Sequence, residues 1–131
     1  MYLRFITQFV NENGQTERGF FNGVAYIQNH LSTSDEDKEK LDTIYRWFKE
    51  NLEAPEWFKK PEYRQHEYHS ISWFKDSAKE HILKIQEAME ILEKYDLIVE
   101  RVTTKKPGRI FFEDKFQISA VPFYDKRKAV I

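Results

Sequence analysis

The sequence predicts an α+β fold: a mostly antiparallel sheet of about five strands, with helices packed on one face. Short runs in both halves of the chain alternate apolar and polar residues, which is typical of strands with one buried face. Three longer segments repeat apolar residues every three or four positions, which is typical of amphipathic helices. At 131 residues the chain has the length of one domain. We therefore expect residues 1–131 to form a single domain.

The composition favours a packed, soluble protein and argues against several functional classes. Aromatic residues make up 16% and hydrophobic residues 40% of the chain, which argues against a disordered protein. The formal net charge is −1 and no cysteine is present. The charge argues against a general nucleic-acid binder, and the lack of cysteine fits a reducing compartment. Because no apolar run has the length of a signal-peptide core or a membrane span, we expect a cytoplasmic protein.

The N-terminal region predicts one strand followed by a loop. Residues 2–10 alternate, so that Leu3, Phe5 and Phe9 fall on one side of a strand. An Asn-Gly pair then indicates a turn. Residues 15–18 are too polar to support a second hairpin arm, and we interpret them as a loop.

Two helices are predicted next, joined as an αα-hairpin. The first covers residues 20–31, with Leu31 as the last member of its apolar stripe. The second covers residues 34–52. Thr33 and Glu36 have the spacing of a capping box, which predicts Thr33 as the residue that caps this helix.

The segment 53–70 loses helical periodicity, because Pro55 and Pro61 interrupt it. It is too aromatic for a free linker, so we expect an ordered loop that folds back on the domain or is covered by a partner. Its large aromatic residues are candidate contact residues, since such side chains often anchor protein interfaces. These candidates are Trp57, Tyr63 and Tyr68.

A short strand at 71–74 precedes the third predicted helix. Ser77 and Glu80 form a second capping box, which predicts the helix start. A further strand at 97–103 follows the helix, so the unit resembles a βαβ crossover with one parallel strand pair. The buried stripe of the helix is predicted to contain Ala78, Ile82, Ile85, Met89 and Leu92.

The last two strands are predicted to form a hairpin, and two registers are compatible with its sequence. Burial favours a three-residue loop at 113–115. That register predicts one buried face made of Ile110, Phe112, Phe116, Ile118 and Ala120. It predicts an outer face made of Arg109, Phe111, Gln117, Ser119 and Val121. The residues after Pro122 are expected to form a basic tail over 124–131.

Several groups of residues could carry chemistry, but each also has a plain structural interpretation. His66, His69 and His81 have acidic neighbours, yet without a further strong ligand they do not predict a metal site. We interpret His81 as a histidine that packs between helices. Glu113 and Asp114 at the hairpin turn are interpreted as turn residues, with no catalytic residue predicted. Lys75 follows a strand and precedes a helix, a place that suits anions.

A weak nucleic-acid contact is the third functional hypothesis. It rests on basic residues near the last hairpin and on the basic tail, and it competes with the interpretation of a solvated turn. These residues are Arg101, Lys105, Lys106 and Arg109.

The chain resembles a family of small bacterial proteins. The resemblance rests on the opening MYLRF, the block ISWFKDSAKEHI at 71–82 and the block PGRIFFEDKFQISAVPF at 107–123. Phe112 stands where that family has Tyr, and Lys115 where it has an acid. The family carries no activity that transfers to this chain. The resemblance implies an immunity protein that accompanies a polymorphic toxin, of the cell-wall-associated kind found in Bacillus-type bacteria.

Two functions from different classes are therefore expected. The first is a non-enzymatic interaction module, an immunity protein that neutralises a cognate toxin in the cytoplasm, with no cofactor. Its acidic first helical turn would attract a basic toxin. Its expected contact residues are Trp57, Tyr63, Tyr68, Glu113, Asp114, Asp35 and Glu36. The second is a small enzyme or ligand-binding domain with a pocket between sheet and helices, lined by Trp73, Lys75, His81 and Gln117.

Overall fold

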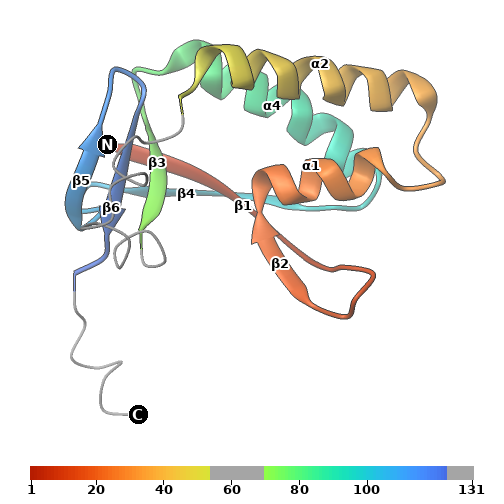
Figure 1. The fold of residues 1–131 in the computed structure, drawn as a ribbon, viewed down its shortest axis with the longest axis horizontal. Coiled ribbons are helices and arrows are strands. Elements are labelled where there is room, and N and C mark those ends of the chain that lie inside the picture. The colour runs from red at the N-terminus through yellow and green to blue at the C-terminus, as the bar shows by residue number, and fades with distance from the viewer. Residues whose placement is uncertain (54–69, 124–131) are drawn as a thin grey trace. The chain divides into compact units, whose positions relative to one another are not determined.

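A computed structural model of the chain describes residues 1–53 and 70–123. The α+β prediction is confirmed, since the described residues form six strands and three helices (Figure 1). In chain order these are β1 (Tyr2–Val10), β2 (Thr16–Gly19), α1 (Phe20–Gln28), α2 (Asp35–Asn51), β3 (Ile71–Lys75), α4 (Lys79–Lys94), β4 (Val99–Thr104), β5 (Arg109–Glu113) and β6 (Gln117–Val121).

The strands pair in the order β2-β1-β3-β6-β5, and β4 also pairs with β1. The β1–β2, β1–β3, β3–β6 and β5–β6 pairs are antiparallel. The predicted β3–β4 parallel pair is wrong, because β3 lies between β1 and β6 and β4 pairs with β1 instead. The helix between β3 and β4 therefore carries the chain past a neighbouring strand.

The described chain divides into two compact units. The first, which we call the helical unit, consists of Arg4–Glu53 and Lys79–Val102 and holds all three helices. In it, α2 packs against both α1 and α4. Its core residues are Phe5, Phe9, Phe20, Val24, Ile27, Leu41, Ile44, Phe48, Ile85, Ala88, Leu92, Leu97 and Val99.

The second unit, which we call the strand unit, contains residues 1–3, 70–78 and 103–123 among those described. β6 is its central strand, because β3 pairs with one edge and β5 with the other. Residues 117–120 of β6 are all buried, so both faces of this strand are covered.

A hairpin arm replaces the loop predicted at 15–18. β2 pairs with β1 through Val10 opposite Thr16 and Phe9 opposite Glu17. The turn is closed by Asn11, whose side-chain oxygen accepts bonds from two backbone N–H groups of the turn. This strand is exposed and polar, so backbone pairing and turn geometry specify it where apolar side chains do not.

The boundaries of the first two helices differ from the prediction by a few residues. α1 ends at Gln28 and Leu31 is 97% exposed, so its predicted place in the buried stripe is wrong. Ser34, and not Thr33, caps α2, because its Oγ accepts a bond from the Asp37 N–H at 3.1 Å. The Thr33 hydroxyl is buried and donates to the Ile27 carbonyl at 2.6 Å.

The third helix, α4, is rotated relative to the predicted stripe. It begins at Lys79, two residues after the predicted Ser77 cap. Ile82 and Met89 are half-buried, whereas the predicted members Ala78, Ile85 and Leu92 are buried. The buried residues of the helix itself are His81, Ile85, Ala88 and Leu92.

The predicted register of the last hairpin is wrong. Glu113 pairs with Ile118 and Ile110 pairs with Ala120, with an irregularity between Ile110 and Phe112. This shift exposes Ile110, which was expected in the core, and buries Gln117 and Ser119, which were expected outside. The one-residue irregularity and the two covered faces of β6 remove the simple alternation on which the prediction relied.

Candidate functional site

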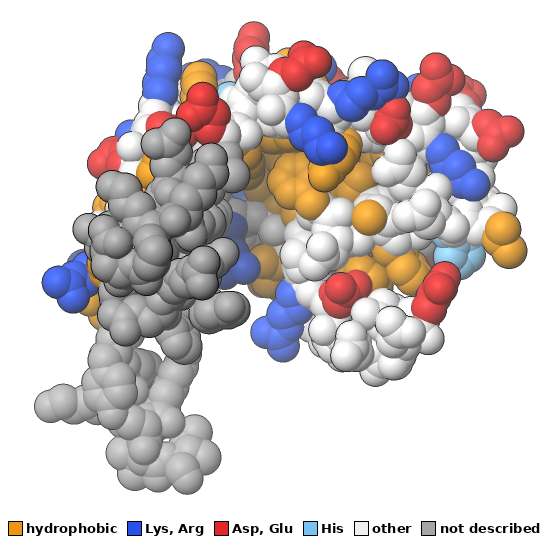
Figure 2. All heavy atoms as spheres, in the orientation of Figure 1, with side chains coloured by type: hydrophobic (Ala, Val, Ile, Leu, Met, Phe, Trp, Pro, Cys, Tyr) orange, Lys and Arg blue, Asp and Glu red, His pale blue; other side chains and the backbone are white. Residues whose placement is uncertain are grey.

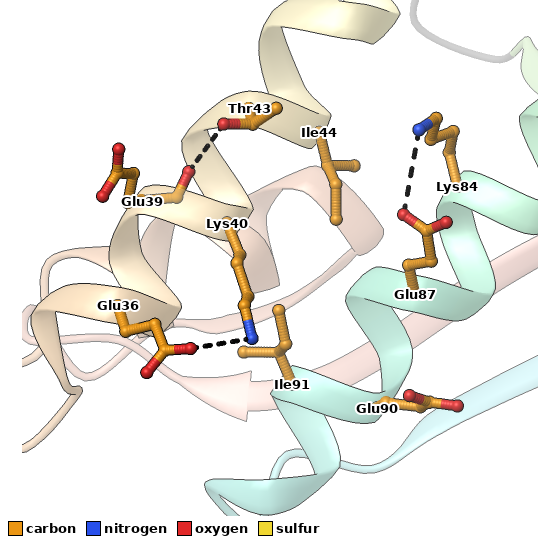
Figure 3. Close-up of a pocket in the computed structure, with 9 residues that line it drawn as sticks. All are labelled: Glu36, Glu39, Lys40, Thr43, Ile44, Lys84, Glu87, Glu90 and Ile91. Atoms are coloured by element: carbon orange, nitrogen blue, oxygen red, sulfur yellow. Dashed lines mark hydrogen bonds and ion pairs between the residues drawn. The ribbon is translucent and has the colours of Figure 1, made fainter.

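One concave surface of the helical unit is a groove between α2 and α4. We call it the interhelical groove. It has a volume of about 600 Å³ and is open to solvent. Figure 3 shows its two walls, one from each helix, with Lys40, Ile44 and Ile91 between them and the side chains of Glu39 and Glu90 directed away from that space. Its lining residues are Glu36, Glu39, Lys40, Thr43, Ile44, Lys84, Glu87, Glu90 and Ile91.

The apolar floor of the interhelical groove follows from the amphipathic pattern of its helices. Ile44 belongs to the buried stripe of α2 and is only 7% exposed. Ile91 lies on the flank of the α4 stripe and is half-buried. In Figure 3 the two side chains project into the space between the helices. An apolar floor below a charged rim is the arrangement in which a helical segment of a partner can bind.

Carboxylates outnumber lysines on the rim of the groove. Lys40 pairs with Glu36 at 3.2 Å, and Lys84 pairs with Glu87 at 3.8 Å. Within residues 1–53 and 70–123, no ion pair involves the carboxylates of Glu39 and Glu90. The rim therefore presents two uncompensated negative charges. Figure 2 shows the charged side chains that gather along α2.

A network of polar groups around the buried Asp37 joins the start of α2 to the end of α4. Asp37 is 4% exposed, and its carboxylate accepts bonds from the Tyr95 hydroxyl at 2.6 Å and from the Lys94 amine at 2.9 Å. The Ser34 N–H donates to the Tyr95 hydroxyl at 3.0 Å. We call these residues the Asp37 network. The hydrogen bonds, that of Tyr95 first, lower the pKa of Asp37 from 3.8 to about 2, so the carboxylate is charged at neutral pH.

Some of the predicted contact residues lie in the helical unit, some lie in the strand unit, and the others fall outside the described residues. Asp35 and Glu36 lie exposed in the first turn of α2, and Glu36 lines the interhelical groove. Glu113 and Asp114 lie at the β5–β6 turn of the strand unit. The aromatic candidates Trp57, Tyr63 and Tyr68 and the basic tail lie outside the described residues.

Three of the four predicted pocket residues, Trp73, Lys75 and Gln117, lie on the paired strands β3 and β6, near the two acids of the β5–β6 turn. The Lys75 amine contacts the Glu113 carboxylate at 2.6 Å. Gln117 stands opposite Phe74 on β3, so its side chain lies on the other face of the sheet from those of Trp73 and Lys75. We call these residues and the two turn acids the hairpin cluster.

The hydrogen bonds of Asp114 hold the β5–β6 turn and leave this acid little capacity to bind a ligand. One of its carboxylate oxygens accepts bonds from the Phe116 and Gln117 N–H groups, at 2.8 and 2.9 Å. The other accepts a bond from the Gln117 side-chain amide at 3.1 Å. The acid is thus occupied in holding the turn, the structural role that its sequence position suggested.

The fourth predicted pocket residue, His81, lies in the helical unit and is 2% exposed. Its Nε2 donates to the Asn51 carbonyl at 2.8 Å, at the end of α2. Its ring packs against Trp47 and Phe48, with centroid distances of 4.8 and 5.9 Å. His81 therefore holds α4 against α2, which is the packing role expected from the sequence.

The interhelical groove was not predicted from the sequence, although part of its composition is readable there. Glu87 and Glu90 are exposed and lie outside the buried stripe of α4, and Lys84 is half-buried. That two acidic faces border one groove depends on how α2 packs against α4. An excess of exposed acids on two helices joined in one unit is the signal that could have indicated it.

The described residues contain no group of three or more His, Cys, Asp or Glu side chains that could hold a metal ion. None of the helices in residues 1–53 and 70–123 is long and apolar enough to cross a membrane. No family model, curated protein or solved structure matches the chain. Functional inference therefore depends on the geometry described above.

Proposed function

We propose that this chain is a non-enzymatic interaction module that binds a cationic segment of a partner protein in the interhelical groove. The observation that carries the proposal is the charge imbalance of the rim. Glu39 and Glu90 add negative charge that no lysine of the described chain neutralises through an ion pair. A lysine or arginine of a partner would complete this rim.

The floor of the groove supports a segment that is amphipathic. Ile44 and Ile91 offer apolar surface between the charged walls. A partner helix with apolar residues on one side and cationic residues at its flanks would cover the floor and reach the rim together. A purely ionic ligand, such as a polyamine, would leave the floor exposed.

The walls of the groove are held together in a way that supports recognition of a preformed surface. The Asp37 network ties α2 to α4 at one end, and His81 ties the helices at the other through Asn51. A surface that is already arranged loses little conformational entropy on binding. This favours specific binding of one partner.

The most concrete partner is a cognate toxin, which the chain would neutralise as an immunity protein in the cytoplasm. The acidic rim and the acidic first turn of α2 would attract a basic toxin by long-range electrostatics. Asp35 and Glu36 lie in that turn, so this surface includes two of the expected contact residues.

The proposal is tested by co-expressing the chain with the product of the neighbouring gene and measuring their affinity after co-purification. A double variant, Glu39→Lys with Glu90→Lys, reverses the two uncompensated charges. We expect it to weaken binding about tenfold or more, mainly by slowing association. The affinity of the unchanged chain should fall steeply as salt is raised.

A matched control is the double variant Glu50→Lys with Glu93→Lys. Both of these glutamates are exposed and lie on the same two helices, but outside the groove. The control changes the net charge by the same amount, and its affinity should stay within about twofold of the unchanged chain. Equal loss in both double variants, or no complex with a neighbouring gene product, would contradict the proposal.

The alternative, a small ligand-binding domain or enzyme that uses the hairpin cluster, is supported less well than the interaction module. Lys75 and Glu113 neutralise each other, and Asp114 is occupied by the turn. A thermal-shift screen with nucleotides and divalent metals tests this alternative. A clear shift that Lys75→Met removes would favour it over the interaction module.

A further inference from the structure

A second concave surface lies on the helical unit between the β1–β2 turn and α1, and the proposed function makes no use of it. We call it the amide groove. It has a volume of about 340 Å³. Figure 2 shows acidic side chains and white polar atoms gathered over the β1–β2 turn. The residues used in the argument are Asn11, Asn22, Asn29, Glu12, Glu17 and Tyr26, all of which line it.

Two of the asparagine side chains are oriented by bonds to the backbone. The Asn11 oxygen accepts from the N–H groups of Asn13 and Gln15, at 2.9 and 3.0 Å. Its amide NH₂ therefore remains as a donor. Asn29 is held the opposite way, because its NH₂ donates to the Ala25 carbonyl at 2.8 Å. The groove thus carries one oriented amide donor and one oriented carbonyl acceptor.

The ring of Tyr26 adds a fixed apolar surface to the amide groove. It packs on Phe9, with ring centroids 4.6 Å apart, and is also close to the ring of His30, at 5.8 Å. Because Phe9 belongs to the core, the position of the Tyr26 ring is set by packing. A half-buried aromatic ring bordered by polar groups can contact the apolar face of a flat, polar ligand.

The charge of the amide groove restricts the ligand class. Its titratable acids are Glu12 and Glu17, and no lysine or arginine of the described ranges 1–53 and 70–123 lines it. A phosphate, a sulfate or another anion would be repelled. The carboxylates and the Asn29 carbonyl accept hydrogen bonds, and the Asn11 and Asn22 amides donate them. Acceptors and donors that line one groove match neighbouring hydroxyl groups, each of which both donates and accepts.

From these observations we infer that the amide groove binds an uncharged saccharide. The vicinal hydroxyls would bond to the oriented amides and to the carboxylates, and a face of the sugar ring would lie against Tyr26. The groove is distinct from the interhelical groove and shares no residue with it. Saccharide binding is therefore independent of the proposed partner binding.

The test is a titration of the full chain, labelled with ¹⁵N, with cellobiose, maltose and N,N′-diacetylchitobiose, followed by NMR. Each sugar is raised to about 10 mM, which detects complexes with dissociation constants in the millimolar range. We expect at least one of them to shift the amide signals of the β1–β2 turn and of α1. The variants Asn22→Ala and Glu17→Gln should each weaken that complex several-fold.

The control variant is Gln15→Ala. Gln15 lies exposed on the same turn but does not line the groove, and its backbone bonds persist after the substitution. Its affinity for the sugar should equal that of the unchanged chain. Saturable shifts whose affinity Asn22→Ala weakens several-fold and Gln15→Ala leaves unchanged support the inference. The inference is overturned if none of the three sugars shifts the amide signals, or if the affinity for the sugar is the same in Asn22→Ala as in Gln15→Ala.

Discussion

The hairpin cluster of the strand unit and the interhelical groove of the helical unit contain similar residue types with different consequences. In the hairpin cluster, Asp114 accepts three hydrogen bonds and Lys75 pairs with Glu113. In the groove, two carboxylates of the rim have no ion pair within the described chain. Polar groups that satisfy one another stabilise a fold, and groups left over are available to a partner.

Candidate functional residues are usually chosen where chemically active residue types occur together, but here such a group has a structural role. The hairpin cluster contains a lysine, two acids, a glutamine and a tryptophan on neighbouring strands, residue types that are common in active sites. Its hydrogen bonds instead hold a turn. The groove consists of ordinary surface glutamates and lysines, and only the imbalance between them points to a partner.

The largest expected effect concerns the backbone of the hairpin at Gly108. Its φ of +121° is unfavourable for residues with a side chain, and an added Cβ would overlap the Val121 carbonyl oxygen and lie 2.7 Å from Pro122 Cα. We expect Gly108→Ala to lower the free energy of unfolding by about 3 kcal/mol. Chemical denaturation followed by circular dichroism measures it.

Gly14 provides the matched control for this substitution. It also has a positive φ, of +76°, but a Cβ there would meet nothing within 4 Å. Gly14→Ala should therefore cost about 1 kcal/mol, the cost of the backbone conformation alone. If both variants lose the same free energy of unfolding, the close approach of Gly108 to Val121 adds nothing to the cost of the substitution.

The next prediction compares an acid from each region. Asp114→Ala leaves two backbone N–H groups and one side-chain amide without their acceptor, so it should cost about 2 kcal/mol of unfolding free energy. Glu90→Gln in the groove should change stability by less than about 0.5 kcal/mol. Urea unfolding of both variants decides the comparison. A loss from Glu90→Gln as large as that from Asp114→Ala would show that the groove acids are structural.

The fold was more predictable from the sequence than the site, and particular residues show why. The periodicity of α2 located that helix within one residue at each end. Ser34 caps this helix in place of the predicted Thr33, because the Thr33 hydroxyl donates to the Ile27 carbonyl. The hairpin register failed at the turn, because Glu113 pairs with Ile118 and residues 114–117 lie between them, whereas a loop at 113–115 was predicted.

The interhelical groove could not be predicted because it depends on tertiary packing. The stripe expected on α4 included Ile82 and Met89, whereas the helix turns His81 and Ala88 into the core. That rotation decides which acids of α4 face α2. Sequence periodicity identifies a buried face to within a neighbouring residue, and a groove at its border is sensitive to that difference.

The smallest expected effect concerns the Asp37 network, a closed set of polar groups like the hairpin cluster, but located beside the open groove. Tyr95→Phe removes the bond to Asp37 and the acceptor for the Ser34 N–H. It should cost about 1 kcal/mol at neutral pH. Binding of the cationic partner should persist, because Tyr95 does not line the groove.

The pH dependence of stability distinguishes the hydrogen bond from Tyr95 to Asp37 from a packing role of the Tyr95 ring. Because the pKa of Asp37 is lowered from 3.8 to about 2 in the folded chain, its contribution to stability is complete above about pH 4 and is lost as the pH falls toward 2. In Tyr95→Phe the folded pKa should rise toward 3.8, since the first cause of the shift is gone. The difference in stability between the two proteins should therefore shrink as the pH falls from 4 to 2. Thermal unfolding across this range measures it, and a difference that stays constant would mean that Tyr95 acts through packing and not through the Asp37 carboxylate.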